Sequence, residues 1–142
     1  LTWDVLTLPD VDDGQGKYVL LVVDAFTGYA KAYRTKDTKA YAAVDSLLDY
    51  ISMFGVPSTV SSDGGPHFIA TVLANLCTEL GIHKHIVVSH SPWAVGIVER
   101  LNRELIRVLT KLRQDYKLPV SQWYRVLPTA MFALNNTPSR TR

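Results

Sequence analysis

Three acidic residues occupy positions where an acid is unusual. Asp4 falls inside a predicted strand, a setting that disfavours Asp, whereas Asp63 ends another strand before two glycines and Glu99 lies near a helix start. Carboxylates on such elements can converge on one point, where a divalent cation relieves their repulsion. Two Mg²⁺ ions about 3.5–4 Å apart could then activate a water or hydroxyl and stabilise a leaving oxygen.

Each acid also has a purely structural explanation. Asp63 suits a turn before Gly-Gly, and Asp4 could protect a strand edge from aggregation. Glu99 could be a first-turn acid favoured by the helix dipole, or the partner of Arg103 one turn later. No single acid decides between a chemical and a structural role.

The helix expected over residues 97–116 separates an apolar from a basic side. At 100° per residue, one arc contains Ile97, Val98, Leu101, Leu105, Val108, Leu109 and Leu112. Glu99 points well away from the centre of that arc, as expected for an exposed acid. The basic side carries Arg100, Arg103, Arg107, Lys111 and Arg113, which form either a solvated face or a set of DNA phosphate contacts.

The elements that must position these residues follow the order β-β-β-α-β-α-β-α-α. Strands are predicted over residues 2–8, 18–24, 29–34, 58–62 and 82–88. Helices are predicted over residues 38–53, 66–80, 97–116 and from Pro119 or Val120 to near Asn135, with a loop over 89–96. This order predicts an α/β fold, in which helices pack on a mixed sheet and the first three strands form an antiparallel meander.

Composition and length indicate one globular domain over residues 1–142. Of the 142 residues, 47% are hydrophobic and 20% are charged, and no apolar run is long enough to span a bilayer. Cys77 is the single cysteine, so an internal disulfide is impossible and a reducing compartment is expected. A zinc site of two His and two Cys is excluded, and one built on His83, His85 and Cys77 is poorly supported by their spacing.

The charge is unevenly distributed along the chain. Residues 1–83 contain five Lys+Arg against ten Asp+Glu, whereas residues 84–142 contain ten against three. One half could hold cations and the other could meet phosphates, although two solvated faces would give the same pattern.

Taken together, the motifs resemble the catalytic core of retroviral and gypsy-type retrotransposon integrases, whose signature is Asp, Asp, 35 residues and Glu. Here 35 residues separate Asp63 from Glu99. The surrounding matches cover nearly the whole chain and are Trp3-Asp4, VDAFTGY at 23–29, FGVP at 54–57, SDGGPHF at 62–68 and SPWAVGIVERLNR at 91–103.

The resemblance implies an RNase H-like fold with a mixed five-stranded sheet. It also implies that Asp4, Asp63 and Glu99 bind two Mg²⁺ ions per site, with Mn²⁺ as a substitute and no small-molecule cofactor. Asp4 is preferred to Asp24 as the first acid. Water would cut near the 3′ end of element DNA, and the freed 3′-hydroxyl would attack target DNA.

Further residues are assigned by the same resemblance. Asn102 and Arg103 match helix positions near the site and DNA, and Gly96 matches a loop glycine associated with mobility over the active site. DNA contacts are therefore expected from Trp93, Gly96, Arg100, Asn102, Arg103 and Arg107. The chain departs from the family at Gly64, where Asn or Arg is usual, and at Ser91-Pro92, where His-Pro is common. These departures concern loop contacts and target preference rather than the triad.

The expected partners are double-stranded DNA and further copies of the chain, in a homodimer or higher oligomer, with no membrane. The expected location is the nucleus or a virus-like particle, and the chain is expected to lack the zinc-binding N-terminal and basic C-terminal domains of such integrases. A cut-and-paste transposase nuclease of the same fold stays open as an alternative. So does a decayed or domesticated core that binds DNA without catalysis.

Overall fold

Antiparallel pairing of three strands forms the centre of the protein, of which the computed structural model describes residues 1–137. The strands are β1 (Thr2–Thr7), β2 (Tyr18–Val23), β3 (Ala30–Thr35), β4 (Thr59–Val60) and β5 (Val87–Val88). β1, β2 and β3 form the predicted antiparallel meander, and β4 pairs in parallel with β5. A parallel bridge between Thr2 and Ser61 places β4 beside β1, so the strand order is β3-β2-β1-β4-β5.

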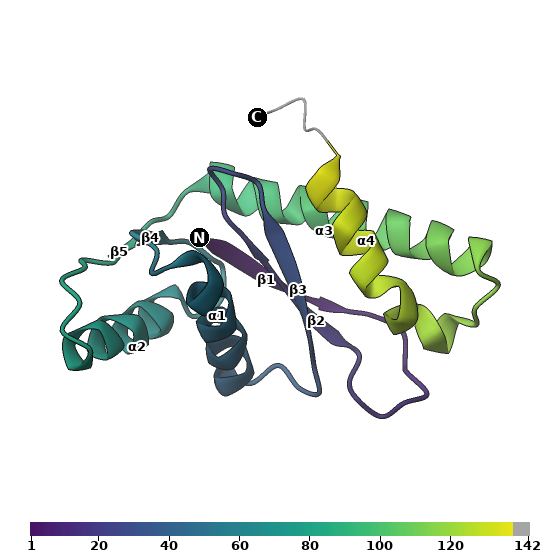
Figure 1. Ribbon diagram of the computed structural model, residues 1–142, viewed down its shortest axis with the longest axis horizontal. Helices are drawn as coiled ribbons and strands as arrows, with labels where there is room; N and C mark the ends of the chain where they lie inside the picture. The colour runs from purple at the N-terminus through teal and green to yellow at the C-terminus, as the bar shows by residue number, and fades with distance from the viewer. Residues whose placement is uncertain (138–142) are drawn as a thin grey trace.

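Helices cover both faces of the strands (Figure 1). They are α1 (Ala40–Phe54), α2 (Pro66–Glu79), α3 (Pro92–Asp115), the 3₁₀ helix η1 (Val120–Val126) and α4 (Leu127–Asn136). The predicted α/β class is confirmed. The expected five-stranded sheet is present as sheets of three and two strands, which the single Thr2–Ser61 bridge connects.

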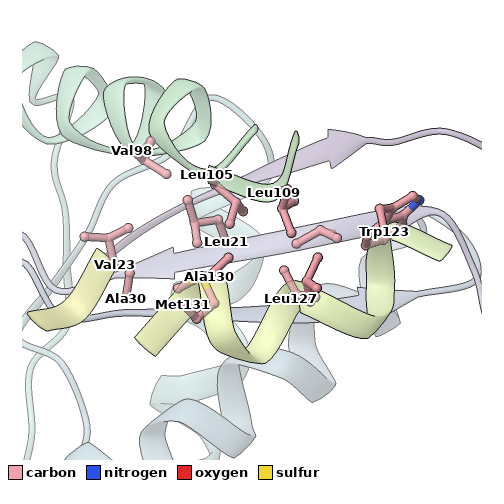
Figure 2. Close-up of a cluster of buried hydrophobic side chains, with 12 residues drawn as sticks. Leu21, Val23, Ala30, Val98, Leu105, Leu109, Trp123, Leu127, Ala130 and Met131 are labelled. Carbon is pink, nitrogen blue, oxygen red and sulfur yellow. The ribbon is translucent and has the colours of Figure 1, made fainter. Parts of the chain in front are cut away.

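Strand β2 separates two hydrophobic cores because its side chains alternate between the faces. Val19, Leu21 and Val23 face α3, η1 and α4, whereas Leu20 and Val22 face α1 and α2. Figure 2 shows the first core, where Leu21 and Val23 meet Val98, Leu105 and Leu109 of α3. All five residues 19–23 are buried, as a central strand that is apolar on both faces requires.

Helix α3 begins earlier than the sequence predicts, so the loop expected over residues 89–96 is confirmed at 89–91 and wrong at 92–96. Ser91 is its N-cap, whose side chain accepts a hydrogen bond from the backbone N–H of Ala94 at 3.2 Å, and Pro92 occupies the first turn. Ser at the cap followed by Pro is a typical helix start. Trp93 and Gly96 consequently lie inside the helix rather than in a loop before it.

Two other elements differ from prediction. β5 contains only Val87–Val88, because the exposed segment around His83 and His85 that precedes it does not pair with β4. The expected last helix is divided into η1 and α4, with non-helical backbone at Gln122. Pro128, in the first turn of α4, lacks an N–H and would clash with the carbonyl four residues earlier in a continuous helix. Over residues 1–137, no helix has the length and apolar character needed to cross a membrane.

Candidate active site

Asp4 lies in the middle of β1 on the face covered by α3. Trp3, its neighbour, packs into the core beneath α1 and α2, so strand alternation directs Asp4 to the opposite face. Its Oδ2 accepts a hydrogen bond of 2.9 Å from Nδ2 of Asn102 on α3, and its Oδ1 accepts one of 2.9 Å from the backbone N–H of Val5. The carboxylate is therefore held from two sides while it remains partly exposed.

Asp63 follows β4 and is brought towards Asp4 by the contact between β4 and β1. The Thr2–Ser61 bridge is supported by a 2.9 Å hydrogen bond from the backbone N–H of Ser61 to the carbonyl of Leu1. One residue further on, the Ser62 hydroxyl donates to the carbonyl of Trp3 at 3.2 Å. Extension of this parallel register by one more residue sets Asp63 level with Asp4, and Asp63 is exposed.

The sequence after Asp63 turns the chain sharply into α2. Gly65, the N-cap of that helix, has φ +66° and ψ 30°, a left-handed conformation that glycine adopts without steric cost. The turn prevents β4 from continuing alongside β1. The two parallel strands thus separate at their carboxyl ends, which is where open α/β sheets commonly bind ligands.

A pocket of about 280 Å³ lies between β1, the turn after β4, and helices α1 and α2. Its lining includes Asp4 and Val5 from β1, Gly64 and Gly65 from the turn, and Phe68 from α2. Sequence reasoning did not identify Phe68 as a pocket residue, because it predicted only that a helix begins at about Pro66. Trp3, Ala43 and Ile69 also line it, so the pocket lies on the α1/α2 side of β1. Asp63 is not among the lining residues.

Glu99 lies on α3 and is exposed, as the helical periodicity predicts. Val98 and Leu105 on the same helix are buried, and the partly buried members of the predicted arc pack against the same core. No ion pair joins Glu99 to Arg103 in the part of the chain that the structure describes. Asn102, which donates a hydrogen bond to Asp4, is three residues after Glu99. Residues three apart are neighbours on a helix surface, so Glu99 lies next to the residue that contacts Asp4.

The three carboxylates are not gathered into one cluster. Among residues 1–137, no three His, Cys, Asp or Glu side chains lie close enough to hold one metal ion together. The Thr2–Ser61 bridge brings the segment before Asp63 beside β1, and Asn102 links Asp4 to the helix that carries Glu99. All three offer hard oxygen ligands of the kind that Mg²⁺ prefers, so their chemistry fits this cation although their side chains are apart.

The predicted DNA contacts fall into an exposed and a buried group. Arg100, Arg103 and Trp93 are exposed on α3, whereas Arg107 is exposed but donates to Glu104 Oε2 at 2.6 Å. Asn102 is only 7% exposed. The structure therefore places Asn102 between α3 and β1, and its predicted contact with DNA is untested.

Asp24, the alternative first acid, has a turn role. Its Oδ1 accepts a hydrogen bond of 2.9 Å from the backbone N–H of Phe26, and its carbonyl accepts one from Gly28 at 2.7 Å. This arrangement is an Asx turn between β2 and β3.

Sequence reasoning did not identify the pairing of His67 and His90. Their ring centroids are 6.1 Å apart, which brings the start of α2 close to the segment before α3. Because 22 residues separate the two histidines in the sequence, neither periodicity nor local spacing could reveal the contact.

Comparison with known proteins identifies related sequences across most of the chain. A family model described as "Integrase core domain" matches residues 1–92. The Gag-Pol polyprotein of Woolly monkey sarcoma virus is 35% identical over 141 residues, which are 97% of this chain and 8% of that polyprotein. The Gag-Pol polyprotein of Gibbon ape leukemia virus is 37% identical over 125 residues, which are 87% of this chain and 7% of the polyprotein. This chain thus spans under a tenth of the length of these curated relatives.

Solved structures match the fold over nearly the whole chain. The HTLV-2 integrase catalytic core domain, described in complex with magnesium in a dimeric form, has a TM-score of 0.65 and 25% identity, covering 96% of this chain and 86% of that one. The catalytic core domain of BIV integrase has a TM-score of 0.66 and 26% identity, covering 97% and 84% respectively. The fold is accordingly RNase H-like.

Proposed function

This chain belongs to the family of retroviral-type integrase cores, and from that premise we propose that it is a polynucleotidyl transferase acting on DNA. The proposed reaction has two in-line displacements on phosphorus. Water first cuts near the 3′ end of the element DNA, and the freed 3′-hydroxyl then attacks a phosphodiester of target DNA. The observation that supports this proposal most is the contact of the segment before Asp63 with the segment before Asp4, through the Thr2–Ser61 bridge and the hydrogen bond from Ser62 to Trp3.

We propose that the three acids are the ligands of two Mg²⁺ ions, for which Mn²⁺ can substitute. Asp4 with Asp63 would hold one ion, and Asp4 with Glu99 the other. When bound, the ions supply charge neutralisation at the phosphoryl group in transfer. The description of the similar HTLV-2 core in complex with magnesium supports this choice of cation.

The three acids differ in how firmly the protein holds their carboxylates. Asp4 is anchored by Asn102 and the Val5 N–H, so its carboxylate is positioned before any ligand binds. Asp63 and Glu99 are exposed, so they can change rotamer without displacing packed neighbours. This combination suits a site that closes around a cation and a DNA phosphate.

The proposed DNA contacts lie on the exposed face of α3. Arg100, Arg103 and Arg107 are exposed on the helix that carries Glu99. Guanidinium groups there can pair with phosphate oxygens, which positions DNA without reading its sequence. Double-stranded DNA, both element ends and target, is therefore the proposed substrate.

We also propose that the chain acts as a homodimer or higher assembly. The similar HTLV-2 core is described in dimeric and trimeric forms. Exposed aromatic side chains support the proposal, since Phe26 is 92% and Phe132 is 69% exposed. Large exposed apolar side chains are enriched at protein interfaces.

Substitution of Glu99 tests the proposed function. Glu99→Gln keeps the size of the side chain and removes its charge. On a branched DNA substrate that reports the reversal of strand transfer, we expect activity with Mg²⁺ or Mn²⁺ to fall at least about 100-fold, because several kcal/mol of charge stabilisation would be lost.

Asp115→Asn is the matched control, since Asp115 is an exposed acid at the far end of the same helix. It should retain wild-type activity. A wild-type protein that binds DNA but does not cut it with either metal would contradict the proposal and favour a non-catalytic DNA-binding core.

A further inference from the structure

The pocket between β1, the turn after β4, and helices α1 and α2 has a volume of about 280 Å³. Pockets for drug-sized ligands usually span about 300–1,000 Å³, so this one suits a single flat ring system. Its apolar wall comes from Trp3, Val5, Ala43, Phe68 and Ile69. Trp3 is buried, whereas Phe68 is 53% exposed, so an aromatic ring that also meets solvent borders the pocket.

The rest of the lining offers hydrogen-bonding groups. It consists of Asp4, Thr38, Ser62, Gly64 and Gly65. Both helices begin beside the pocket, and within the described residues neither N-cap makes a side-chain hydrogen bond to its helix. The first N–H groups of a helix have no partner inside it, so a ligand here would meet backbone donors as well as hydroxyl groups.

The charges around the pocket restrict the class of ligand. Among residues 1–137, no Lys, Arg or His lines it, whereas Asp4 does. Asp63 lies between Ser62 and Gly64 in the chain, so a second carboxylate is adjacent. These acids repel an anion such as phosphate, and the apolar wall penalises a desolvated charge of either sign. The ligand that fits is a neutral, flat ring with donors and acceptors on its edge.

Nucleobases belong to this class, and the proposed function brings DNA to this place. The pocket includes Asp4 and adjoins Asp63, so a base next to the reacting phosphodiester would border it. We infer that the pocket receives one unpaired nucleobase, which stacks on Phe68. The inference rests on the proposed function. Extrusion of a base costs least where the base is already unpaired, at a frayed duplex end or at a mismatch.

Gly64 leaves open space at the rim of the pocket. A Cβ on Gly64 would meet nothing within 4 Å, and its backbone does not have positive φ, so a larger residue can be accommodated. The integrases that this chain resembles usually have Asn or Arg at this position, so the chain departs from its family where the pocket opens. Gly64→Asn should therefore narrow the rim and hinder entry of a base.

DNA affinity tests the inference through three duplexes of equal length. One is fully paired, one has an unpaired thymine at its end, and one has a central thymine mismatch. In fluorescence anisotropy, we expect the wild type to bind one of the two unpaired duplexes about 10-fold more tightly than the paired one, as for one base–aromatic stack. Preference for the end indicates a base of the element DNA, and preference for the mismatch indicates one of the target.

Phe68→Ala should abolish this preference without weakening binding of the paired duplex, and Gly64→Asn should reduce it while the aromatic ring is kept. Leu80→Ala is the matched control, because Leu80 is a 64% exposed apolar residue directly after the far end of α2. It should keep the wild-type preference. A preference that survives in Phe68→Ala would overturn the inference.

A photochemical cross-link identifies the residue that meets the base. With 5-iodouracil in place of the unpaired thymine, irradiation followed by mass spectrometry should find the DNA attached to Phe68. Attachment only to another exposed aromatic residue, such as Trp93, would place the base outside the pocket and overturn the inference.

The inference and the proposed function can fail separately. If the wild type cuts DNA but binds paired and unpaired duplexes equally, the pocket does not receive a base, and the proposed function stands. If the wild type cuts no DNA with Mg²⁺ or Mn²⁺, the proposed function fails, and titration with free deoxyadenosine decides the chemistry of the pocket. Shifts of the Gly64 and Gly65 amides in the ¹H–¹⁵N spectrum would support a nucleobase site, and unchanged amides would overturn it.

Discussion

At the scale of single residues, the three acids differ in how much the protein restrains them. Asp4 has two hydrogen-bond partners, whereas Asp63 and Glu99 are exposed. Sequence reasoning selected all three acids and placed Glu99 correctly on the outer side of its helix. It did not anticipate that Asn102 would hold Asp4, although the same periodicity places Asn102 four residues after Val98, on the buried stripe.

Removal of one basic side chain from α3 should change DNA binding in a salt-dependent way. Arg103 is exposed and, among the described residues, makes no ion pair, so its charge is available to a phosphate. For Arg103→Gln, we expect weaker DNA binding and a slope of log K against log salt that is less steep by about 0.9, as for the loss of one phosphate contact.

Fluorescence anisotropy across a KCl series measures this slope, with Lys36→Gln, an exposed cation just after β3, as the control. If both variants change the slope equally, the effect is one of net charge and the α3 contact is wrong.

At the scale of elements, the start of α3 is the clearest departure from the sequence prediction. The apolar periodicity begins at Ile97, so it cannot detect a first turn whose Trp93 faces outward; the Ser91-Pro92 cap was the informative signal. For a related reason, the predicted β5 is too long, and the predicted last helix is in fact two helices, η1 and α4. Tertiary pairing with β4 limits β5, and Pro128 separates α4 from η1, and neither effect is visible in local hydrophobicity.

Gly96→Ala tests whether the segment before residue 97 is helical. A Cβ at Gly96 would meet nothing within 4 Å, and the backbone does not have positive φ. We expect the variant to be more stable by about 0.5–1 kcal/mol in urea unfolding, because Ala favours helix over Gly.

Gly65→Ala is the opposite case, since Gly65 has φ +66°, and it should destabilise the protein by about 1–2 kcal/mol. Destabilisation by Gly96→Ala instead would indicate that residues 92–96 form a loop.

The attachment of η1 to the sheet should depend on pH. Arg34 makes two hydrogen bonds to Asp13, at 2.9 and 2.7 Å, and its guanidinium lies 4.4 Å from the ring centroid of Tyr124. The hydrogen bond from Arg34 holds the pKa of Asp13 below its usual value of 3.8. The stabilisation is therefore fully present above the usual pKa and is lost as pH falls through the lower, folded-state pKa.

Asp13→Asn should lower Tm at neutral pH and reduce the further fall in Tm that the wild type shows below about pH 4. Thermal unfolding by circular dichroism between pH 2 and pH 7 measures both effects. An unchanged acid dependence in the variant would show that this pair does not contribute to it.

At the scale of the whole molecule, the fold was predictable because local patterns and long-range packing agree. The all-apolar β2 had to be central, and the amphipathic α3 had to cover one face. The parallel contact between β1 and β4 was not predictable from the hydrophobic pattern of the sequence. It depends on a bridge between Thr2 and Ser61, which are 59 residues apart. The acidic first half supplies Asp4 and Asp63, and the basic second half supplies α3, the helix that we propose contacts DNA.

The most direct test of the central claim is to locate Mn²⁺ by anomalous diffraction from crystals of the wild-type protein. We expect an anomalous peak between the carboxylates of Asp4 and Asp63, with ligand distances of about 2.0–2.4 Å, and loss of that peak in Asp63→Asn. A Mn²⁺ ion bound elsewhere in a protein that cuts DNA, with Asp4 and Asp63 uninvolved, would contradict the assignment of the catalytic centre.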